Sequence, residues 1–179
     1  MSLMIWALSA NAQDDSGYAA LLKPVNEVTI ADSLHIDTLS PAMRPLDSLT
    51  VKKWFSRLLG TAKNNRLRNR DYYLAGKITT HSNFDLLVLL EEKKKQDDSS
   101  NVQVVHLIST RKDGTYIASI EAAAGGIKKR STYNSSSWLY KDLKIVLDSR
   151  ISTDDKLYED MVSYRINNGG RFILNASYE

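Results

Sequence analysis

The chain has 179 residues, of which 42% are hydrophobic, and its 24 Lys and Arg against 21 Asp and Glu give a formal net charge of +3. It contains no cysteine, which excludes disulfide bonds, a thiol nucleophile and a lipid anchor on an N-terminal cysteine. This length predicts a single domain, and no apolar run approaches the roughly 20 residues of a membrane-spanning helix, so we expect a soluble protein.

The first twelve residues are typical of the end of a secretory signal peptide. The apolar run 3–8 is followed by Ala10 and Ala12, the small-x-small pattern that signal peptidase cuts, just before Gln13. No Lys or Arg precedes Lys23, so the positively charged start of such a peptide is missing. We predict a signal-peptide remnant at 1–12 and export to the periplasm or the extracellular space; the alternative is a buried N-terminal strand or helix.

Residues 13–47 are polar and contain all three prolines. They predict an N-terminal arm that is extended over the core or partly disordered at its start. One or two edge strands are expected where Val28 and Ile30, then Leu34 and Ile36, alternate with polar residues. Residues 48–179 are predicted to form the single domain.

One amphipathic helix is predicted at the start of that domain. Five apolar residues share the face of a helix with 3.6 residues per turn: Val51, Trp54, Phe55, Leu58 and Leu59. Asp47 or Ser48 can cap its start, and Gly60 stands where a left-handed C-cap is favoured.

From residue 72 onward, strand patterns alternate with turn signals. The predicted strands are 72–79, 84–92, 102–110, 116–122, 138–151, 160–166 and 172–178. Only the connection 123–137 is long enough for a crossover helix, so an antiparallel meander is expected. The predicted fold class is α+β, with one amphipathic helix packed on an antiparallel, curved sheet of about six or seven strands.

Two predicted hairpins resemble each other, STRKDGTYIAS and YRINNGGRFIL, with Gly114 and Gly170 in register. Hairpin turns require such residues in any case, and this explanation is favoured over an old duplication.

A signal ending AxAQ, a helix, and strands containing KDGTYIASI and LKIVLDS together resemble the small exported β-rich proteins of Bacteroidota. The resemblance covers roughly residues 70–179, implies an envelope or secreted location, and carries no active site. Helix-plus-meander proteins of this size also include the fold of β-lactamase-inhibitory proteins and the nuclear-transport-factor-like domains.

No catalytic residue, metal site or cofactor is predicted. The histidines His35, His81 and His106 are scattered, and His106 shares a strand face with apolar residues, which favours a buried, hydrogen-bonded histidine. The acids Asp148, Asp154 and Asp155 lack the spacing of a calcium loop. The run NNGGR joins two strands and is typical of a hairpin turn rather than a phosphate-binding loop.

The sequence feature that most strongly suggests a binding site is a run of basic residues. The basic residues between positions 52 and 70 are Lys52, Lys53, Arg57, Lys63, Arg66, Arg68 and Arg70. No acid interrupts them, and the remaining 17 basic residues face 21 acidic ones, so the rest of the chain carries −4. Such a segment binds acidic polymers, lipid headgroups or an acidic protein; the alternative is a solvated surface, neutralised by Asp71 or by Asp97 and Asp98.

We therefore predict an anion or partner site at Lys63, Arg66, Arg68 and Arg70, on a loop too polar to be held by burial. Trp138, at the start of a strand, is the candidate aromatic contact. The predicted function is a non-catalytic exported binding module of the cell envelope that engages a protein or an anionic polymer, with no role in nucleic-acid binding. The alternatives are a small-molecule carrier or enzyme that uses the concave face of the sheet, and a structural envelope component.

Overall fold

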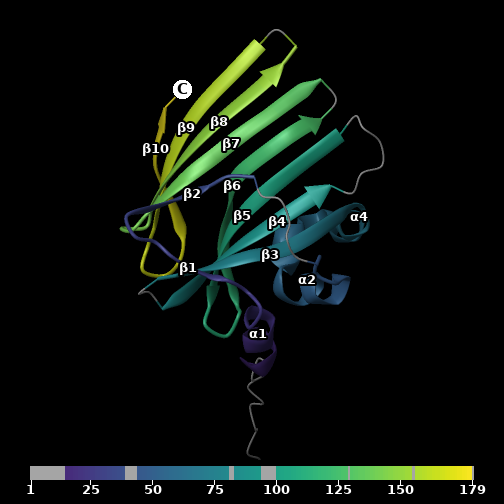
Figure 1. Cartoon of the computed structure of the whole chain (residues 1–179), viewed down its shortest axis with the longest axis vertical. Coiled ribbons are helices and arrows are strands. Elements are labelled where there is room, and N and C mark those ends of the chain that lie inside the picture. The colour runs from purple at the N-terminus through teal and green to yellow at the C-terminus, as the bar shows by residue number, and fades with distance from the viewer. Residues whose placement is uncertain are drawn as a thin grey trace, which may run out of the picture.

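The computed structural model describes residues 15–38, 44–80, 83–93, 100–128, 130–154 and 156–178. The predicted leader remnant 1–12, His81, Asp97, Asp98 and Asp155 lie outside this range. Within it the chain is mostly β, with 60% of residues in strands that form one ten-stranded sheet (Figure 1).

The helices are short and lie before the main run of strands. They are α1 Asp15–Leu22, α2 Ser48–Trp54, α3 Ser56–Leu59, the 3₁₀ turn η1 Gly60–Ala62, and α4 Lys63–Asn69. Strands β1 Glu27–Thr29 and β2 Ser33–Ile36 belong to the N-terminal arm. The others are β3 Arg70–Thr79, β4 Phe84–Lys93, β5 Ser100–Arg111, β6 Tyr116–Lys128, β7 Ser131–Tyr140, β8 Lys144–Thr153, β9 Lys156–Ile166 and β10 Phe172–Tyr178.

The sheet has the order β1-β3-β4-β5-β6-β7-β8-β9-β10. Neighbours from β3 to β10 are antiparallel, whereas β1 runs parallel to β3, with Val28 opposite Ile78. Strand β2 pairs with the second half of β7, where Leu34 lies opposite Leu139, while β6 pairs with the first half. The arm thus fills the edge of β7 that β6 leaves open.

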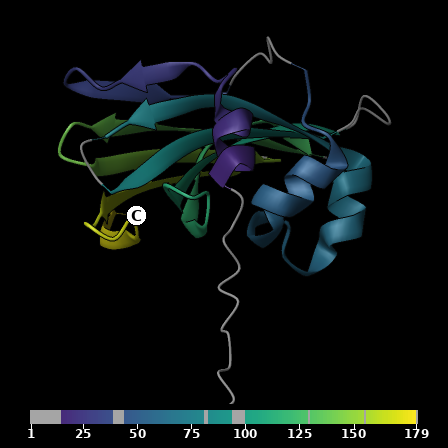
Figure 2. The ribbon, with the colours of Figure 1, turned by 90° about the horizontal axis from the view of Figure 1, so that it is seen from below.

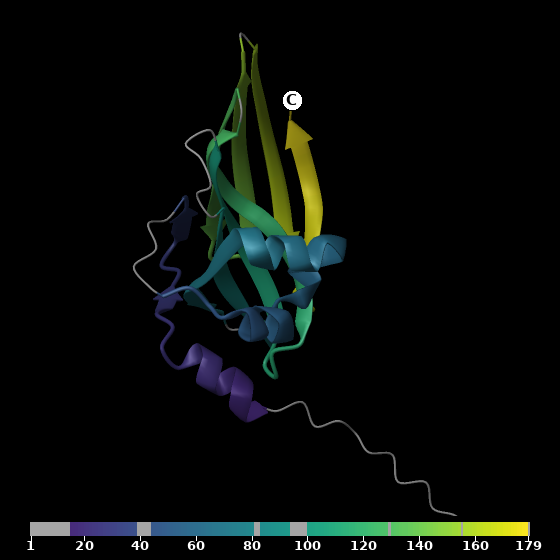
Figure 3. The ribbon, with the colours of Figure 1, turned by 90° about the vertical axis from the view of Figure 1, so that its right-hand side faces the viewer.

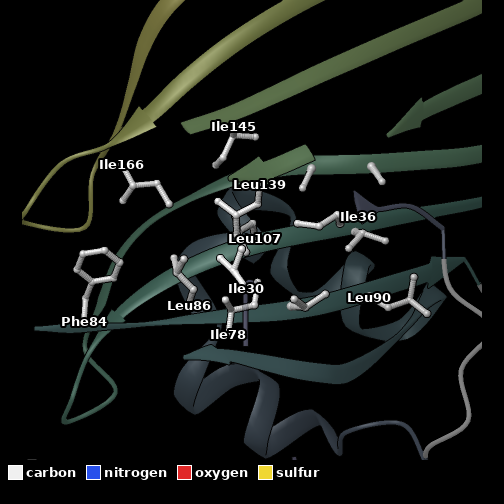
Figure 4. Close-up of a cluster of buried hydrophobic side chains, with 14 residues drawn as sticks. Ile30, Ile36, Ile78, Phe84, Leu86, Leu90, Leu107, Leu139, Ile145 and Ile166 are labelled. Carbon is white, nitrogen blue, oxygen red and sulfur yellow. The ribbon is translucent and has the colours of Figure 1, made fainter. Parts of the chain in front are cut away.

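Strand β4 is apolar on both sides because both sides are covered. Leu86, Val88 and Leu90 point into one core, and Leu87 and Leu89 point into the other. The first core takes residues from the arm and from the full width of the sheet (Figure 4). Its buried members are Ile30, Ile36, Ile78, Phe84, Leu86, Val88, Leu90, Val105, Leu107, Ala122, Ala123, Leu139, Ile145 and Ile166.

The second core joins the helices to strands β3–β5. Trp54 and Phe55 are 7% and 1% exposed, and the ring of Tyr18 from α1 lies 5.3 Å from that of Trp54. Figure 2 shows the helices on one side of the sheet and the arm strands on the other. None of the described helices covers the far end of β7–β9 (Figure 3), where Leu157, Tyr158 and Met161 are exposed.

The predicted fold class was wrong in three respects. The sheet has ten strands rather than six or seven, it is mixed rather than purely antiparallel, and several short helices replace the single one. The predicted helix breaks at Phe55, whose backbone leaves the helical region at φ −120°, ψ 19°. The break separates α2 from α3 and leaves Val51, Trp54, Phe55 and Leu59 buried.

Residues 123–137 were predicted as a connection but form the end of β6 and most of β7. The small residues of this segment do not form a turn; they let neighbouring chain segments pack close to the strand. A Cβ added to Gly126, at φ +119°, would lie 1.7 Å from the carbonyl oxygen of Asn101, and one added to Gly125 would lie 2.6 Å from Thr38 Cγ2. Strand patterns miss such segments because glycine, alanine and serine carry no apolar periodicity.

The strand predicted over 138–151 is also two strands. β7 ends at Tyr140 and β8 begins at Lys144, with Leu143 at φ +64° in the turn between them. The arm, for which one or two edge strands were predicted, contains β1 and β2.

Candidate functional site

Helices α2–α4 present a cationic surface, which we call the helix surface. Its exposed basic residues are Lys52, Lys53, Arg57, Lys63 and Arg68. The helices lie together beside strands β3–β5 in Figures 1 and 2, so cations spread over 17 positions come to one region of the molecule. No acidic residue occurs between positions 48 and 70 to offset them.

Asp47 starts this region as the N-cap of α2. Its Oδ1 accepts hydrogen bonds from the backbone amides of Leu49 and Thr50, both at 2.9 Å, and its Oδ2 accepts one from Thr50 Oγ1 at 2.6 Å. These bonds, led by those from Thr50, lower the pKa of the Asp47 carboxyl. The carboxylate therefore caps the start of the helix, a role for which the sequence predicted Asp47 or Ser48.

Two of the predicted site residues, Arg66 and Arg70, do not face solvent freely. Arg66 Nη2 lies 2.7 Å from Oε2 and 2.9 Å from Oε1 of Glu91, and Arg66 Nη1 donates to the carbonyl of Leu58 at 2.8 Å. Arg70 Nη1 lies 2.6 Å from Glu91 Oε1. The Glu91 side chain is 0% exposed, so both guanidinium groups balance a buried charge.

His106 and Tyr72 complete this buried cluster. His106 Nε2 lies 3.0 Å from Glu91 Oε2, and Tyr72 stands opposite Glu91 in the β3–β4 register. Burial opposes ionisation of Glu91, but the hydrogen bonds from His106 and Arg66 outweigh it, and the pKa of Glu91 is lowered. Burial and the nearby Glu91 charge raise the pKa of Tyr72 to about 12, and its hydroxyl has no hydrogen-bond partner in the described part of the chain.

The cluster explains why the segment 63–69 is helical rather than the polar loop that was predicted. Arg66 ties α4 to Glu91 and to the end of α3, and Leu67 packs against the second core. An ion pair, a hydrogen bond to α3 and an apolar contact therefore hold the helix in place.

A carboxylate that orients a histidine is the arrangement used in general-base catalysis. Here His106 is 2% exposed and Glu91 is 0% exposed, so no substrate atom reaches the imidazole in this conformation. The geometry supports a structural role, and it confirms the expectation that His106 is a buried, hydrogen-bonded residue.

The other predicted site residues are placed differently. Lys63 and Arg68 are exposed, and neither forms an ion pair with any residue that the structure describes. Trp138 is 45% exposed and lies on β7, where its ring lies 4.5 Å from that of His35 on β2. The structure therefore does not unite Trp138 with the basic residues in one contact network.

Sequence reasoning missed both buried carboxylates. Glu91 closes an apolar run that reads as an ordinary strand end, and Asp85 opens the same run. Asp85 is 4% exposed, lies 2.6 Å from Lys112 Nζ, and is 3.8 Å from Lys77 Nζ. In the sequence, each of these acids stands directly next to a continuous apolar run. In the structure, both lie on the face of β4 that the helices cover.

The Tyr18 hydroxyl, which is near Asp85, lies 2.6 Å from Thr110 Oγ1. Burial is the main reason that the pKa of Tyr18 is raised to about 12. Among the described residues, no three His, Asp or Glu side chains gather closely enough to hold a metal ion.

Comparison with protein-family models, with curated proteins and with solved structures found no match. None of the helices in the described ranges is long and apolar enough to cross a membrane.

Proposed function

We propose that the protein is a non-catalytic binding module of the cell envelope that holds an anionic polymer on its helix surface. The observation that carries the proposal is a set of exposed cations on α2–α4 that form no ion pair with any described residue: Lys52, Arg57, Lys63 and Arg68. One buried carboxylate, Glu91, is shared by Arg66 and Arg70, and it offsets one of the seven positive charges between Lys52 and Arg70.

A polymer is favoured over a folded protein partner because the surface has little apolar area. Leu49, at 77% exposed, is the one exposed large hydrophobic residue in α2–α4. Protein interfaces usually have an apolar core inside a polar rim, whereas a flexible polyanion needs only spaced positive charges.

Salt-gradient elution from a heparin column tests the proposal. The test variant is Lys52→Glu, Arg57→Glu, Lys63→Glu, Arg68→Glu, which changes the charge by eight without touching the Glu91 pairs. The matched control reverses four exposed cations on the other half of the sheet: Lys141→Glu, Lys144→Glu, Lys156→Glu, Arg165→Glu.

We expect the wild type and the control to be retained to similar salt concentrations and the test variant to elute early, because exposed charges act over about 8–10 Å at physiological salt. If the two variants elute together, retention reflects net charge alone and the helix surface is not a site. A wild type that is not retained at low salt also contradicts the proposal.

A further inference from the structure

The two hairpin turns that resemble each other in sequence also share a conformation. In the β5–β6 turn, Arg111 N donates to Thr115 O at 2.8 Å and Gly114 N to Arg111 O at 2.9 Å. In the β9–β10 turn, Asn167 N donates to Arg171 O at 3.0 Å and Gly170 N to Asn167 O at 2.9 Å. Gly114 and Gly170 take the left-handed backbone at φ +85° and +79°.

These turns lie at the same end of the sheet (Figure 1), and the β9–β10 turn is fixed in place. Ser109 Oγ donates to the carbonyl of Gly170 at 2.5 Å, across 61 positions of sequence. A Cβ on Gly170 would lie 3.0 Å from Ile117 Cδ1 and 3.2 Å from Phe84 Cγ. Glycine at this position therefore lets the turn pack directly on the first residues of β4 and β6.

Between the two turns lies a cleft of about 620 Å³. Its size is within the range of about 300–1,000 Å³ that is usual for small-molecule sites. Phe84, Tyr116 and Ile117 supply its apolar wall, and the turn residues supply a polar rim. None of its lining residues is one of the basic residues of the helix surface.

The charge of the cleft is positive. Arg111, Lys112 and Arg171 line it together with one acid, Asp113. Lys112 is engaged by the buried Asp85 at 2.6 Å, and Asp113 Oδ1 accepts the amide of Thr115 at 2.8 Å.

The side chains that remain available are two guanidinium groups and two amides. Arg111 and Arg171 form no ion pair with any described residue. A backbone hydrogen bond is the main reason that the pKa of Asp113 is lowered, and the Arg111 charge contributes to this shift. Neither Asn83 nor Asn168 makes a side-chain hydrogen bond within the described ranges. Guanidinium groups bind carboxylates and sulfates through paired hydrogen bonds, and amides both donate to and accept from hydroxyl groups.

We propose that this cleft binds an acidic monosaccharide unit. Arg111 and Arg171 hold its carboxylate or sulfate, Asn83 and Asn168 bind ring hydroxyls, and Tyr116 lies against the sugar ring. The cleft shares no residue with the helix surface, so this inference and the proposed function are tested separately.

The experiment is an amide NMR titration of the full chain with four probes: methyl glucuronide, glucose 6-sulfate, neutral methyl glucoside and inorganic sulfate. We expect saturable shifts of the Gly114, Gly169 and Gly170 amide signals with at least one acidic sugar. The neutral sugar and inorganic sulfate should bind at least about tenfold more weakly, because each lacks one half of the recognised chemistry. The acidic sugar that binds distinguishes a carboxylate site from a sulfate site.

The double variant Arg111→Gln, Arg171→Gln should weaken binding of the acidic sugar by about tenfold or more, whereas Lys141→Gln, Lys144→Gln should leave it unchanged. The absence of saturable shifts at these glycines with both acidic sugars overturns the inference. The inference is also overturned if inorganic sulfate binds the wild type as tightly as the acidic sugar does. It is overturned as well if the double variant binds the acidic sugar as tightly as the wild type does. If the double variant does not fold, the four-probe titration of the wild type still decides.

Discussion

Arg66 Nη2 lies 2.7 Å from Oε2 of Glu91, a carboxylate that is fully buried beneath helix α4. The sequence placed Arg66 in a basic run and Glu91 at the end of an apolar strand, 25 positions away. This contact and the one between Arg70 and Glu91 remove both arginines from the set of freely exposed cations. The Arg66 contact also fixes the helix that carries the exposed cations Lys63 and Arg68.

Replacement of Glu91 by Gln should lower the free energy of unfolding at neutral pH by about 3–5 kcal/mol. Removal of one partner from a buried ion pair leaves the other charges uncompensated. Chemical denaturation checks the value. The matched control is Glu121→Gln, which makes the same charge change at an exposed position of β6 and should cost less than about 0.5 kcal/mol. A cost for Glu91→Gln equal to that of the control would contradict the structural role of the cluster.

The difference in stability between wild type and Glu91→Gln should also depend on pH. The pKa of Glu91 is lowered in the folded protein, so its contribution is present above the ordinary carboxyl value of about 4.3 and is lost as the pH falls through the folded value. The groups that face Glu91 are His106, Arg66, Arg70 and Tyr72. Urea denaturation of both proteins at pH 7 and pH 3 should show the difference shrinking at pH 3. A difference that stays constant would mean that the carboxylate charge is not what stabilises the fold.

Glu91→Gln should in addition delay elution of the folded protein from a heparin column. The change removes the negative charge that Arg66 and Arg70 share, and their side chains, at 28% and 30% exposed, border the helix surface. If Glu91→Gln elutes at higher salt than Glu121→Gln, the stronger retention comes from the arginines beside the helix surface and not from the change in net charge. Identical elution of the two variants would show that these arginines do not take part in binding.

Trp54→Ala should destabilise the protein by about 3–5 kcal/mol, because the indole fills the space between Tyr18, the β5–β6 turn and the sheet. Trp138→Ala is the control, since this ring is 45% exposed. We expect it to cost less than half as much in thermal or chemical denaturation. A loss below about 1 kcal/mol for Trp54→Ala would mean that α2 does not pack on the sheet in solution.

Gly114→Ala should cost about 2 kcal/mol or more. The backbone at φ +85° disfavours any side chain, and an added Cβ would lie 2.6 Å from both Trp54 Cζ3 and Tyr18 Cδ2. Gly169→Ala, where the nearest atom is the side-chain oxygen of Asn167 at 3.4 Å, is the control with ordinary backbone geometry. Equal melting temperatures for the two variants would contradict the close packing of this turn under Trp54.

The sequence could predict those parts of the fold in which the spacing of apolar side chains indicates which face is buried. The apolar face of Val51, Trp54 and Leu59 is buried as its spacing indicated, and the apolar run of β4 is a strand covered on both sides. The run 123–137 has no such spacing of apolar residues. Its Gly125 and Gly126 are needed because Thr38 and the backbone of Asn101 approach them too closely for a side chain, and a sequence pattern does not show this approach.

The candidate site was predictable in composition but not in detail. A run of cations predicts a positive surface, yet which cations remain free depends on acids brought near by the fold. Glu91 comes from the neighbouring strand of the sheet, and no local pattern links it to Arg66. The cleft depended on the same kind of information, since its two turns come together only when the β9–β10 turn packs on Phe84, at the start of β4, and bonds to Ser109 on β5.

The pairing of β2 with β7 places a constraint on the order in which the chain folds. Leu34 meets Leu139, and Ile36 meets Ser137, so the N-terminal arm takes its final position only after most of the chain is available. Closing so long a loop costs entropy, and folding rates fall as contacts become more distant in sequence. Ile30 and Ile36 are members of the first core, so that core stays incomplete until β7 is present. Fragments that end before residue 137 should therefore lack cooperative unfolding, and the intact chain should fold slowly for its size.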